Sequence, residues 1–371
     1  MNPLDLARPE IRALQPYSSA RMEARGGTIL LNANESPWPP FAGGEDWNRY
    51  PDPQPAALVA RLARLYGVED DQLLVGRGSD EGIDLLVRAF CAAGRDAILI
   101  SPPTFGMYAV CARVQGAEVV EVPLRRDFAL DVDAVLAAVT PAVKLVFVCA
   151  PNNPAGVGVP RAAILQLVEV LAGRALVVVD EAYVEFADPD GECGSVAACV
   201  GDFENLVVLR TLSKAWALAG VRIGTLLADD RVIGLLRKII PPYPLPVPCA
   251  AAALNALSAE GERTTRERIG TARRERKRMG EALATLACVR AVLPSQANFL
   301  TLRFDDVGMA KTALLDAGIV VRDVRRYPML DDALRITLGT PAENDRVLQV
   351  LNGLGDSCLE RSVVATAEQP P

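Results

Sequence analysis

Short apolar runs separated by helical patterns dominate the first two thirds of the chain. From about residue 73 these runs are LLVG (73–76), DAILI (96–100), EVVEVPL (118–124), KLVFVCA (144–150), ALVVVD (175–180) and LVVLRT (206–211). Continuous apolar runs bounded by turn residues are typical of strands that are buried on both faces. Segments with helical spacing, such as EGIDLLVRAF and AAILQLVEVLA, lie between them. The pattern therefore predicts an α/β fold with a mostly parallel sheet covered by helices.

The pattern changes after PPYPLPVP (241–248), where the density of proline marks a break. A long charged helix is predicted at about 260–286, followed by a strand-helix-strand region with NFLTLRF, MAKTALLDAG, IVVRDV and ALRITLG. We expect an N-terminal arm over 1–30, a large α/β domain over 31–245 and a smaller α+β domain over 246–356. The tail, 357–371, ends in AEQPP and is predicted to be disordered.

Bulk properties exclude several classes of partner. The net charge of −7 argues against a nucleic-acid partner, whose phosphates would be repelled. The basic run at 273–278 is interrupted by Glu275 and is typical of a solvated helix face. No apolar run is long enough to span a membrane, and the N-terminus has no secretory pattern. Eight cysteines without a C-x-x-C pair suit a reducing compartment, so a cytoplasmic protein is predicted.

The chain contains no histidine. This composition excludes Ser–His and Cys–His triads and imidazole ligands, and no metal site is expected. Any proton transfer must use lysine, carboxylate, tyrosine or cysteine side chains.

The segment TLSKAWALAGVRIG (211–224) carries the most specific chemistry. The amine of Lys214 can form a Schiff base with an aldehyde once its charge is disfavoured. Thr211, Ser213 and Arg222 are suited to hold a phosphate dianion. An aldehyde and a phosphate on one small molecule describe pyridoxal 5'-phosphate (PLP). The alternative is an ordinary surface lysine on a helix.

The segment GRGSDEGID follows a predicted strand, at the edge where open α/β sheets place their ligands. Gly78, Ser79 and Asp80 would offer backbone N–H groups and a helix N-terminus to a phosphate. A dinucleotide-binding fingerprint, as in a nicotinamide dehydrogenase, is the alternative. It is disfavoured because the glycine spacing is one residue too long and Asp96 precedes its strand.

Three further strand ends offer groups for the ring of such a cofactor. Asp180 ends the run ALVVVD and could keep a pyridine nitrogen protonated, or else cap a helix. Glu181 should point away from Asp180, and Tyr183 could reach a ring hydroxyl. Asn153 in CAPNNPAG could bond to the same oxygen or form a plain turn. Phe105 in SPPTFGMY could stack on the ring or belong to the core.

In this order and spacing, the turn CAPNNPAG, VVDEAY, RTLSKA and LAGVRIG resemble the fold-type I PLP-dependent aminotransferases. The segments LNANESPWP, RYPDPQP, GRGSDEGIDLLVRAF, PPTFGMY and LRITLGT are similar to those of histidinol-phosphate aminotransferases in particular. The resemblance extends from about Tyr17 to about Leu354. It implies transfer of an amino group from glutamate to imidazole-acetol phosphate, giving L-histidinol phosphate and 2-oxoglutarate, in histidine biosynthesis.

The resemblance also implies a role for each matching residue. Lys214 would carry PLP, with Asp180 at the ring nitrogen and Asn153 and Tyr183 at the ring oxygen. The cofactor phosphate would be held by Ser79, Asp80, Thr211, Ser213 and Arg222, and by Tyr50 of a partner subunit in a homodimer with shared active sites. The substrate would be bound by Tyr17, Asn34, Arg322 and Arg335. Two positions depart from the family pattern, namely Phe105 where many relatives have tyrosine and Ala155 where threonine is common.

Other functions of the same fold remain open from the sequence. Another amino-acid or aromatic aminotransferase, or a phospho-amino-acid decarboxylase, would share the cofactor site and differ at Tyr17, Arg322 and Arg335. A non-catalytic regulator of this fold would be expected to carry a DNA-binding domain, for which the short arm before Asn32 leaves no room.

Overall fold

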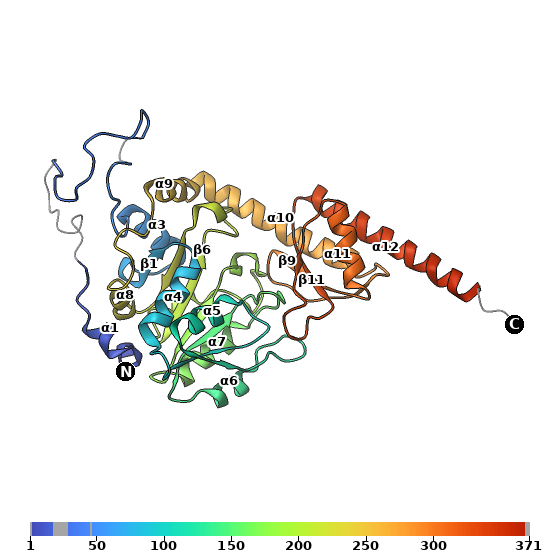
Figure 1. Cartoon of the computed structure of the whole chain (residues 1–371), viewed down its shortest axis with the longest axis horizontal. Helices are drawn as coiled ribbons and strands as arrows, with labels where there is room; N and C mark the ends of the chain where they lie inside the picture. The colour runs from blue at the N-terminus through green and yellow to red at the C-terminus, as the bar shows by residue number, and fades with distance from the viewer. Residues whose placement is uncertain (1, 18–28, 45–46, 368–371) are drawn as a thin grey trace.

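A seven-stranded sheet forms the centre of the protein (Figure 1). The computed structural model describes residues 2–17, 29–44 and 47–367. The sheet has the order β1-β7-β6-β5-β4-β2-β3, in which β7 is antiparallel to both neighbours and the other pairs are parallel. Its strands are β1 (Leu73–Gly76), β2 (Ala97–Ile100), β3 (Glu118–Glu121), β4 (Val143–Cys149), β5 (Leu176–Asp180), β6 (Leu206–Thr211) and β7 (Gly224–Leu227). The predicted mostly parallel sheet is confirmed.

Helices cover both faces of this sheet, which explains why its inner strands are apolar throughout. In β5, Val177 and Val179 belong to one buried cluster, whereas Leu176 and Val178 belong to a second cluster on the opposite face. The first cluster includes apolar side chains of α3 (Ala56–Tyr66), α6 (Val132–Ala138), α7 (Arg161–Val170) and α9 (Val247–Ala256). The second includes those of α4 (Ser79–Phe90), α5 (Met107–Gln115) and α8 (Asp230–Leu236).

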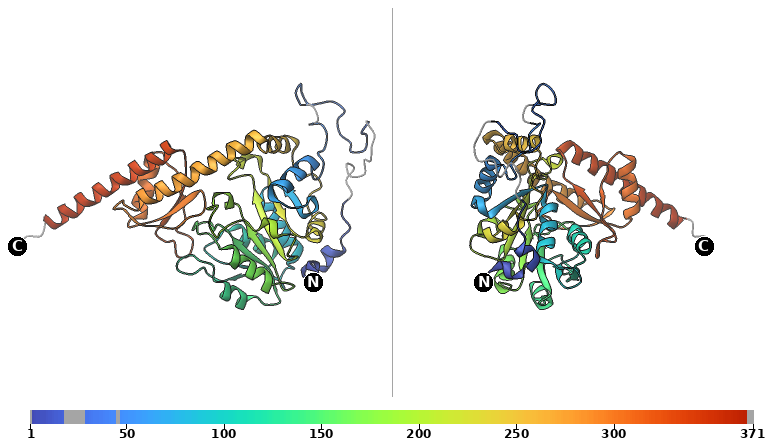
Figure 2. Two further views of the ribbon diagram at one scale, coloured as in Figure 1. Left: turned by 180° about the vertical axis from the view of Figure 1, so that it is seen from behind. Right: turned by 60° about the vertical axis from the view of Figure 1, so that its left-hand side comes forward.

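A second, four-stranded sheet lies beyond α10 (Ala259–Leu283), the long helix that leads away from the large sheet (Figure 2). Its order is β10-β11-β9-β8, and all of its pairs are antiparallel. Apolar side chains of α10, α11 and α12 pack together with this sheet in a separate cluster. The elements are β8 (Val289–Val292), β9 (Phe299–Phe304), α11 (Val307–Asp316), β10 (Arg322–Asp323), β11 (Ala333–Thr337) and α12 (Pro341–Ala367).

The structure adds two strands that the sequence pattern does not reveal. β7 is only GTLL, and β8 is VRAV, so neither offers the continuous apolar run by which the other strands were found. α12 continues to Ala367 and so covers most of the tail, 357–371, for which disorder is expected. The disorder of that tail and the division into domains remain predictions. No helix of the described residues is long and apolar enough to cross a membrane.

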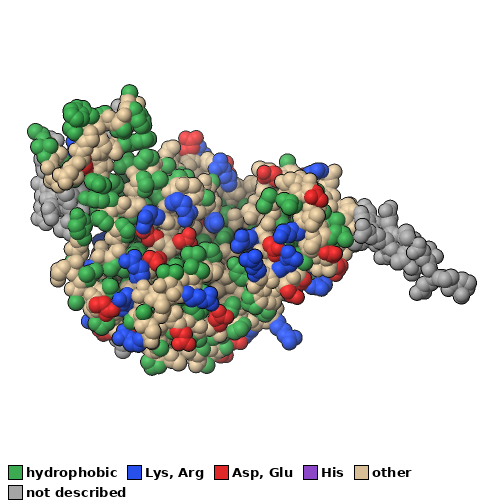
Figure 3. Space-filling view, viewed as in Figure 1, with side chains coloured by type: hydrophobic (Ala, Val, Ile, Leu, Met, Phe, Trp, Pro, Cys, Tyr) green, Lys and Arg blue, Asp and Glu red, His purple; other side chains and the backbone are tan. Residues whose placement is uncertain are grey.

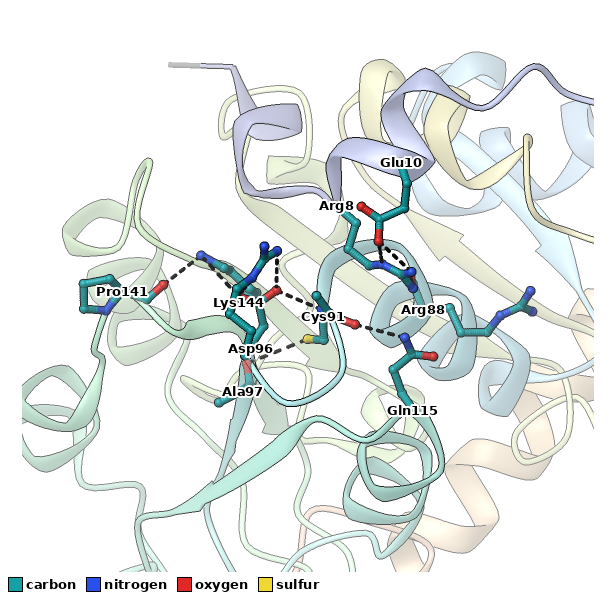
Figure 4. Close-up of polar contacts among 11 residues, drawn as sticks. Arg8, Glu10, Arg88, Cys91, Asp96, Ala97, Gln115, Pro141 and Lys144 are labelled. Atoms are coloured by element: carbon teal, nitrogen blue, oxygen red, sulfur yellow. Dashed lines mark hydrogen bonds and ion pairs between the residues drawn. The ribbon is translucent and has the colours of Figure 1, made fainter.

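The first residues of the expected arm are attached to the end of α4. Arg8, between η1 (Pro3–Leu6) and α1 (Pro9–Ala13), donates from its guanidinium to the carbonyl of Arg88 at 2.8 Å. Its backbone N–H donates to the carbonyl of Ala89 at 3.0 Å, and Ala7 is buried. Figure 4 shows Arg8 between Glu10 and this helix end. Two carbonyl oxygens that a helix C-terminus leaves unpaired are therefore satisfied.

β7 approaches the start of α4 so closely that only glycine fits at the contact. A Cβ atom on Gly224 would lie well inside van der Waals distance of the backbone atoms of Gly78 and Ser79. Neither neighbour is the flexible end of a side chain, so relief of that clash requires a shift of backbone. Gly224 therefore fixes the distance between β7 and the N-terminus of α4.

We predict that Gly224→Ala lowers the thermal midpoint of unfolding by several degrees. Forced overpacking in a tight interior costs about 1–3 kcal/mol. Gly234→Ala in α8 is the matched control, because a Cβ there has no neighbour within 4 Å. Equal midpoints for the two variants would contradict the assigned close approach.

Candidate active site

One pocket at the carboxyl ends of β4, β5 and β6 brings together most of the predicted site residues. The register places Cys149 opposite Asp180, and Asp180 opposite Leu209, so the three strands end at nearly the same level. The N-terminus of α4 closes the same edge. The pocket is lined by Ser79, Asp80, Phe105, Cys149, Asn153, Asp180, Ala182, Tyr183, Thr211, Ser213, Lys214 and Arg222.

Hydrogen-bond donors converge at one end of the pocket. The hydroxyl groups of Thr211 and Ser213 lie 2.9 Å apart, and Arg222 donates to Ser213 Oγ at 3.3 Å. Gly78 is the N-cap of α4 and has no side chain that could cap the helix. A helix N-terminus beside a guanidinium and two hydroxyls is suited to bind a phosphate dianion. Asp80 forms a 3.4 Å ion pair with Arg222.

Lys214 has the environment of a reactive amine. Burial lowers its pKa, and the positive charge of Arg335 lowers it further, while Asp80 opposes the shift. Its Nζ lies 5.6 Å from the centre of the Tyr183 ring. A lowered pKa increases the fraction of neutral amine, which is the form that attacks an aldehyde.

Asp180 is a buried carboxylate held by two hydrogen bonds. It accepts from the hydroxyl of Tyr108 at 2.7 Å and from the N–H of Ala182 at 3.1 Å. Burial raises its pKa, and the two hydrogen bonds oppose that rise. A positive charge in the pocket, such as a protonated pyridine nitrogen, would favour the ionised carboxylate.

Tyr108 is a site residue that the sequence analysis missed. It is fully buried in α5 and its ring stacks on Phe147 with centroids 4.7 Å apart. The sequence did offer a signal, because Tyr108 lies only three residues after Phe105. The hydroxyl of a buried tyrosine usually has a hydrogen-bond partner, which could have drawn attention to this residue. Phe105 contacts the edge of the Tyr108 ring at 5.6 Å.

Glu181 points away from the pocket, as the alternation along an extended chain predicts. Its carboxylate accepts from Ser195 Oγ at 2.6 Å, from the N–H of Val196 at 2.7 Å and from Arg210 at 3.0 Å. Arg210 also pairs with Glu185 at 2.7 Å. This buried network joins the ends of β5 and β6 behind the pocket.

Asn153 links the pocket to the four-stranded sheet. Its Nδ2 faces the hydroxyl of Tyr183 at 3.4 Å, and its Oδ1 accepts a hydrogen bond from Arg335. The guanidinium of Arg335 lies over the Phe299 ring, 5.0 Å from its centre. Its Nε is buried and has no hydrogen-bond partner among the described residues.

Arg322 lies beside Arg335 on the four-stranded sheet, and neither is among the residues that line the pocket. The two are directly paired in the register of β10 and β11, and Arg322 is exposed. Figure 3 shows Lys and Arg side chains grouped over this part of the molecule. The arrangement offers positive charge to an anionic group of a substrate.

Five predicted residues are not among those that line the pocket of their own chain, namely Arg322, Arg335, Tyr17, Asn34 and Tyr50. Tyr17 is 70% exposed and borders a different cavity. Asn34 and Tyr50 line another cavity together, and the Tyr50 ring stacks on Tyr243 with centroids 4.5 Å apart. The roles expected for Tyr17, Asn34 and Tyr50 remain predictions.

The residues of the pocket fit PLP. The phosphate end offers a helix N-terminus and Arg222, Lys214 has a lowered pKa, and the buried Asp180 lacks a cationic partner at bonding distance within the described residues. Asn153 and Tyr183 present donors from the opposite side. Each functional group of PLP thus has a chemically matched neighbour.

Comparisons with known proteins agree with this pocket. Residues 29–351 match the family model described as "Aminotransferase class I and II". The chain is 56% identical over 353 residues to the histidinol-phosphate aminotransferase of Xanthomonas euvesicatoria pv. vesicatoria, covering 94% of this chain and 96% of the relative. It is 52% identical over 356 residues to that of Xylella fastidiosa, covering 95% and 96%.

A solved structure extends the similarity to three dimensions. The histidinol-phosphate aminotransferase from Sinorhizobium meliloti, in complex with pyridoxal-5'-phosphate, has a TM-score of 0.75 and 27% identity to this chain. The match covers 94% of this chain and 97% of that one. The chain therefore belongs to the histidinol-phosphate aminotransferases, within the PLP-dependent class I and II aminotransferase family.

Proposed function

We propose that this protein transfers an amino group from glutamate to imidazole-acetol phosphate, giving L-histidinol phosphate and 2-oxoglutarate, in histidine biosynthesis. The observation that carries the proposal is that Lys214, Asp180 and Asn153 line one pocket and that Arg335 donates a hydrogen bond to Asn153. Burial lowers the pKa of the Lys214 amine, Asp180 is a buried carboxylate, and Arg335 offers an unpaired donor to an anionic substrate.

Each residue of the pocket would serve one part of the cofactor. Bound PLP supplies an electron sink for charge at the carbon that carries the amine. Asp180 would keep the ring nitrogen protonated, and Asn153 and Tyr183 would bond to the ring oxygen. Phe105 would lie against the ring. The phosphate would be held by Ser79, Asp80, Thr211, Ser213 and Arg222.

Lys214 would also move the proton of the reaction. The chain has no imidazole, and the amine of Lys214 is the basic group nearest the centre of the pocket. An amine whose pKa is lowered by burial can accept a proton from the substrate carbon and return it at a neighbouring atom.

Positive charge on the four-stranded sheet supports a phosphorylated substrate. Arg335 and Arg322 are cross-strand partners, and their guanidinium groups can share one phosphate. Tyr17 and Asn34 would complete the substrate site.

We further propose a homodimer in which Tyr50 of each subunit reaches the cofactor phosphate of the other. Tyr50 is half-exposed and lies outside its own pocket. A groove along α4 and α5 is lined by Asp80, which also lines the pocket, and by the exposed Val110 and Val114. A second copy that covers this apolar surface would come close to the phosphate end.

The cytoplasm is the proposed location. Cys91, Cys111, Cys149 and Cys199 are free thiols buried in the core. A reducing compartment suits such thiols.

The first test is a single turnover of the PLP-loaded protein with L-histidinol phosphate. The visible absorbance of the cofactor should fall with L-histidinol phosphate and much less with unphosphorylated L-histidinol. Lys214→Ala should lose about 10²–10⁴-fold or more in rate, because it lacks the proton-transferring amine. Borohydride should fix PLP to Lys214 in a peptide map. Faster reaction with aromatic amino acids, or release of carbon dioxide from a phospho-amino acid, would refute the proposed substrate.

The second test concerns the pKa of Lys214. A protonated amine does not attach PLP, so the attachment rate should rise with pH through a midpoint below the ordinary lysine value of about 10.4. Arg335 lowers this pKa, and Arg335→Met should therefore move the midpoint to higher pH. The growth of visible absorbance after addition of PLP to cofactor-free protein measures the rate. Arg346→Met on α12 is the control, and a shift in both variants alike would contradict a local effect.

The third test mixes two damaged subunits. Tyr50→Ala and Lys214→Ala homodimers should each be nearly inactive, while their heterodimers contain one intact site. Random exchange makes half of the dimers mixed, so about a quarter of wild-type activity should return. Lys214→Ala mixed with Asp180→Asn is the control without recovery, because both residues belong to one chain's pocket. Failure of the Tyr50 mixture to recover, with exchange verified, would exclude sharing through Tyr50.

A further inference from the structure

Thr301 is a fully buried threonine at the junction of the two sheets. It lies on β9 and is the direct cross-strand partner of Arg335 on β11. Its hydroxyl donates a 2.6 Å hydrogen bond to the carbonyl of Pro154, which belongs to the turn after β4 in the other sheet. A buried strand position in an apolar sheet does not need a hydroxyl, so this bond calls for an explanation.

The turn that receives this bond carries Asn153. Inside the turn, Asn152 accepts from the N–H of Ala155 at 3.0 Å and donates to the carbonyl of Pro103 at 3.1 Å. The N–H of Gln296, in the loop before β9, donates to the carbonyl of Gly156 at 2.8 Å. The turn is thus fixed on both sides of Asn153, by Asn152 on one side and by the bond from Thr301 to Pro154 on the other.

The side chains on this face of β9 form a continuous path to the cofactor pocket. Phe299, two residues before Thr301, contacts the ring of Tyr183 edge to face at 5.3 Å and lies under the Arg335 guanidinium. Arg335 in turn donates to Asn153 Oδ1. Asn153 is therefore held by Arg335 through its side chain and by Thr301 through the carbonyl of the next residue.

We propose that Thr301 is a positioning residue, an inference that rests on the proposed function. Its hydroxyl holds the turn at Pro154 against β9, so that Asn153 can accept from Arg335 and present its Nδ2 to the ring oxygen at the same time. Through this contact β9, the strand paired with the one that carries Arg335, sets the orientation of a cofactor-binding amide.

The hydrogen bond to Pro154 depends on the hydroxyl of Thr301 alone. Its effect can therefore be separated from the effect of side-chain packing. Thr301→Val keeps the shape of the side chain and removes the hydroxyl, leaving the Pro154 carbonyl without its donor. Thr301→Ser keeps the hydroxyl and removes a methyl group. A packing role predicts that serine is the more harmful change, and a positioning role predicts that valine is.

The experiment compares the PLP-loaded variants by kinetics and by absorbance. Thr301→Val should bind PLP, raise the KM for L-histidinol phosphate about tenfold and change kcat much less, because a weakened charged hydrogen bond costs binding. It should also raise the pH midpoint of the visible absorbance, since a donor at the ring oxygen favours its negative form. Thr301→Ser should resemble the wild type in both measurements.

A double-mutant cycle tests whether Thr301 acts through Asn153. Asn153→Ala should raise the KM and the absorbance midpoint by itself, and Thr301→Val should add little in that background. Additive effects, or a Thr301→Val protein with wild-type KM and midpoint, would overturn the inference. If Thr301→Val does not fold, Thr301→Ala removes the same hydroxyl without filling the space and is expected to show the same two shifts.

The two proposals fail in different ways. A wild-type protein that binds PLP but does not react with L-histidinol phosphate would overturn the proposed function. The absorbance midpoint of the PLP-loaded variants does not depend on turnover, so it would still decide whether Thr301 positions Asn153.

Discussion

Burial of β4, β5 and β6 on both faces is the constraint on which the rest of the protein depends. A polar side chain in the middle of these strands would lose its water without gaining a partner. Polar chemistry is therefore confined to the strand ends, and the parallel register places those ends at one level, as the pairing of Cys149 with Asp180 shows. The N-terminus of α4 reaches the same edge because Gly224 permits the close approach of β7.

The charges in the pocket suit a ligand that carries both a positive and a negative group. Burial raises the pKa of Asp180 and lowers that of Lys214, so the surrounding protein disfavours the charged form of each. A ligand with a cationic ring nitrogen near Asp180 and an anionic phosphate near Arg222 supplies the missing counter-charges. In the reverse orientation, the phosphate of the ligand would lie beside the carboxylate of Asp180. Repulsion between these two negative charges fixes the direction of binding.

Strands and site residues that are marked by neighbouring positions could be predicted from the sequence. Those that depend on contacts between distant parts of the chain were missed. Long apolar strands and the residues that follow them were found, because both signals lie in adjacent positions. The antiparallel β7 was not predicted, because its four residues begin with glycine and show no hydrophobic pattern typical of a strand. Tyr108 and Thr301 were missed because their partners, Asp180 and Pro154, are 72 and 147 residues away. Tyr17, Asn34 and Tyr50 lie outside the pocket of their own chain, and their roles stay predictions.

The two ends of α4 serve different parts of the molecule. Its N-terminus faces the phosphate end of the pocket, and its last carbonyl oxygens are bound by Arg8 near the start of the chain (Figure 4). A cation at the C-terminus and an anion at the N-terminus both stabilise the same helix dipole. The first ten residues, remote from the chemistry, therefore help to hold the helix that receives the phosphate. Truncation of that terminus would remove the partners of two carbonyl oxygens at the far end of the helix whose N-terminus lines the pocket.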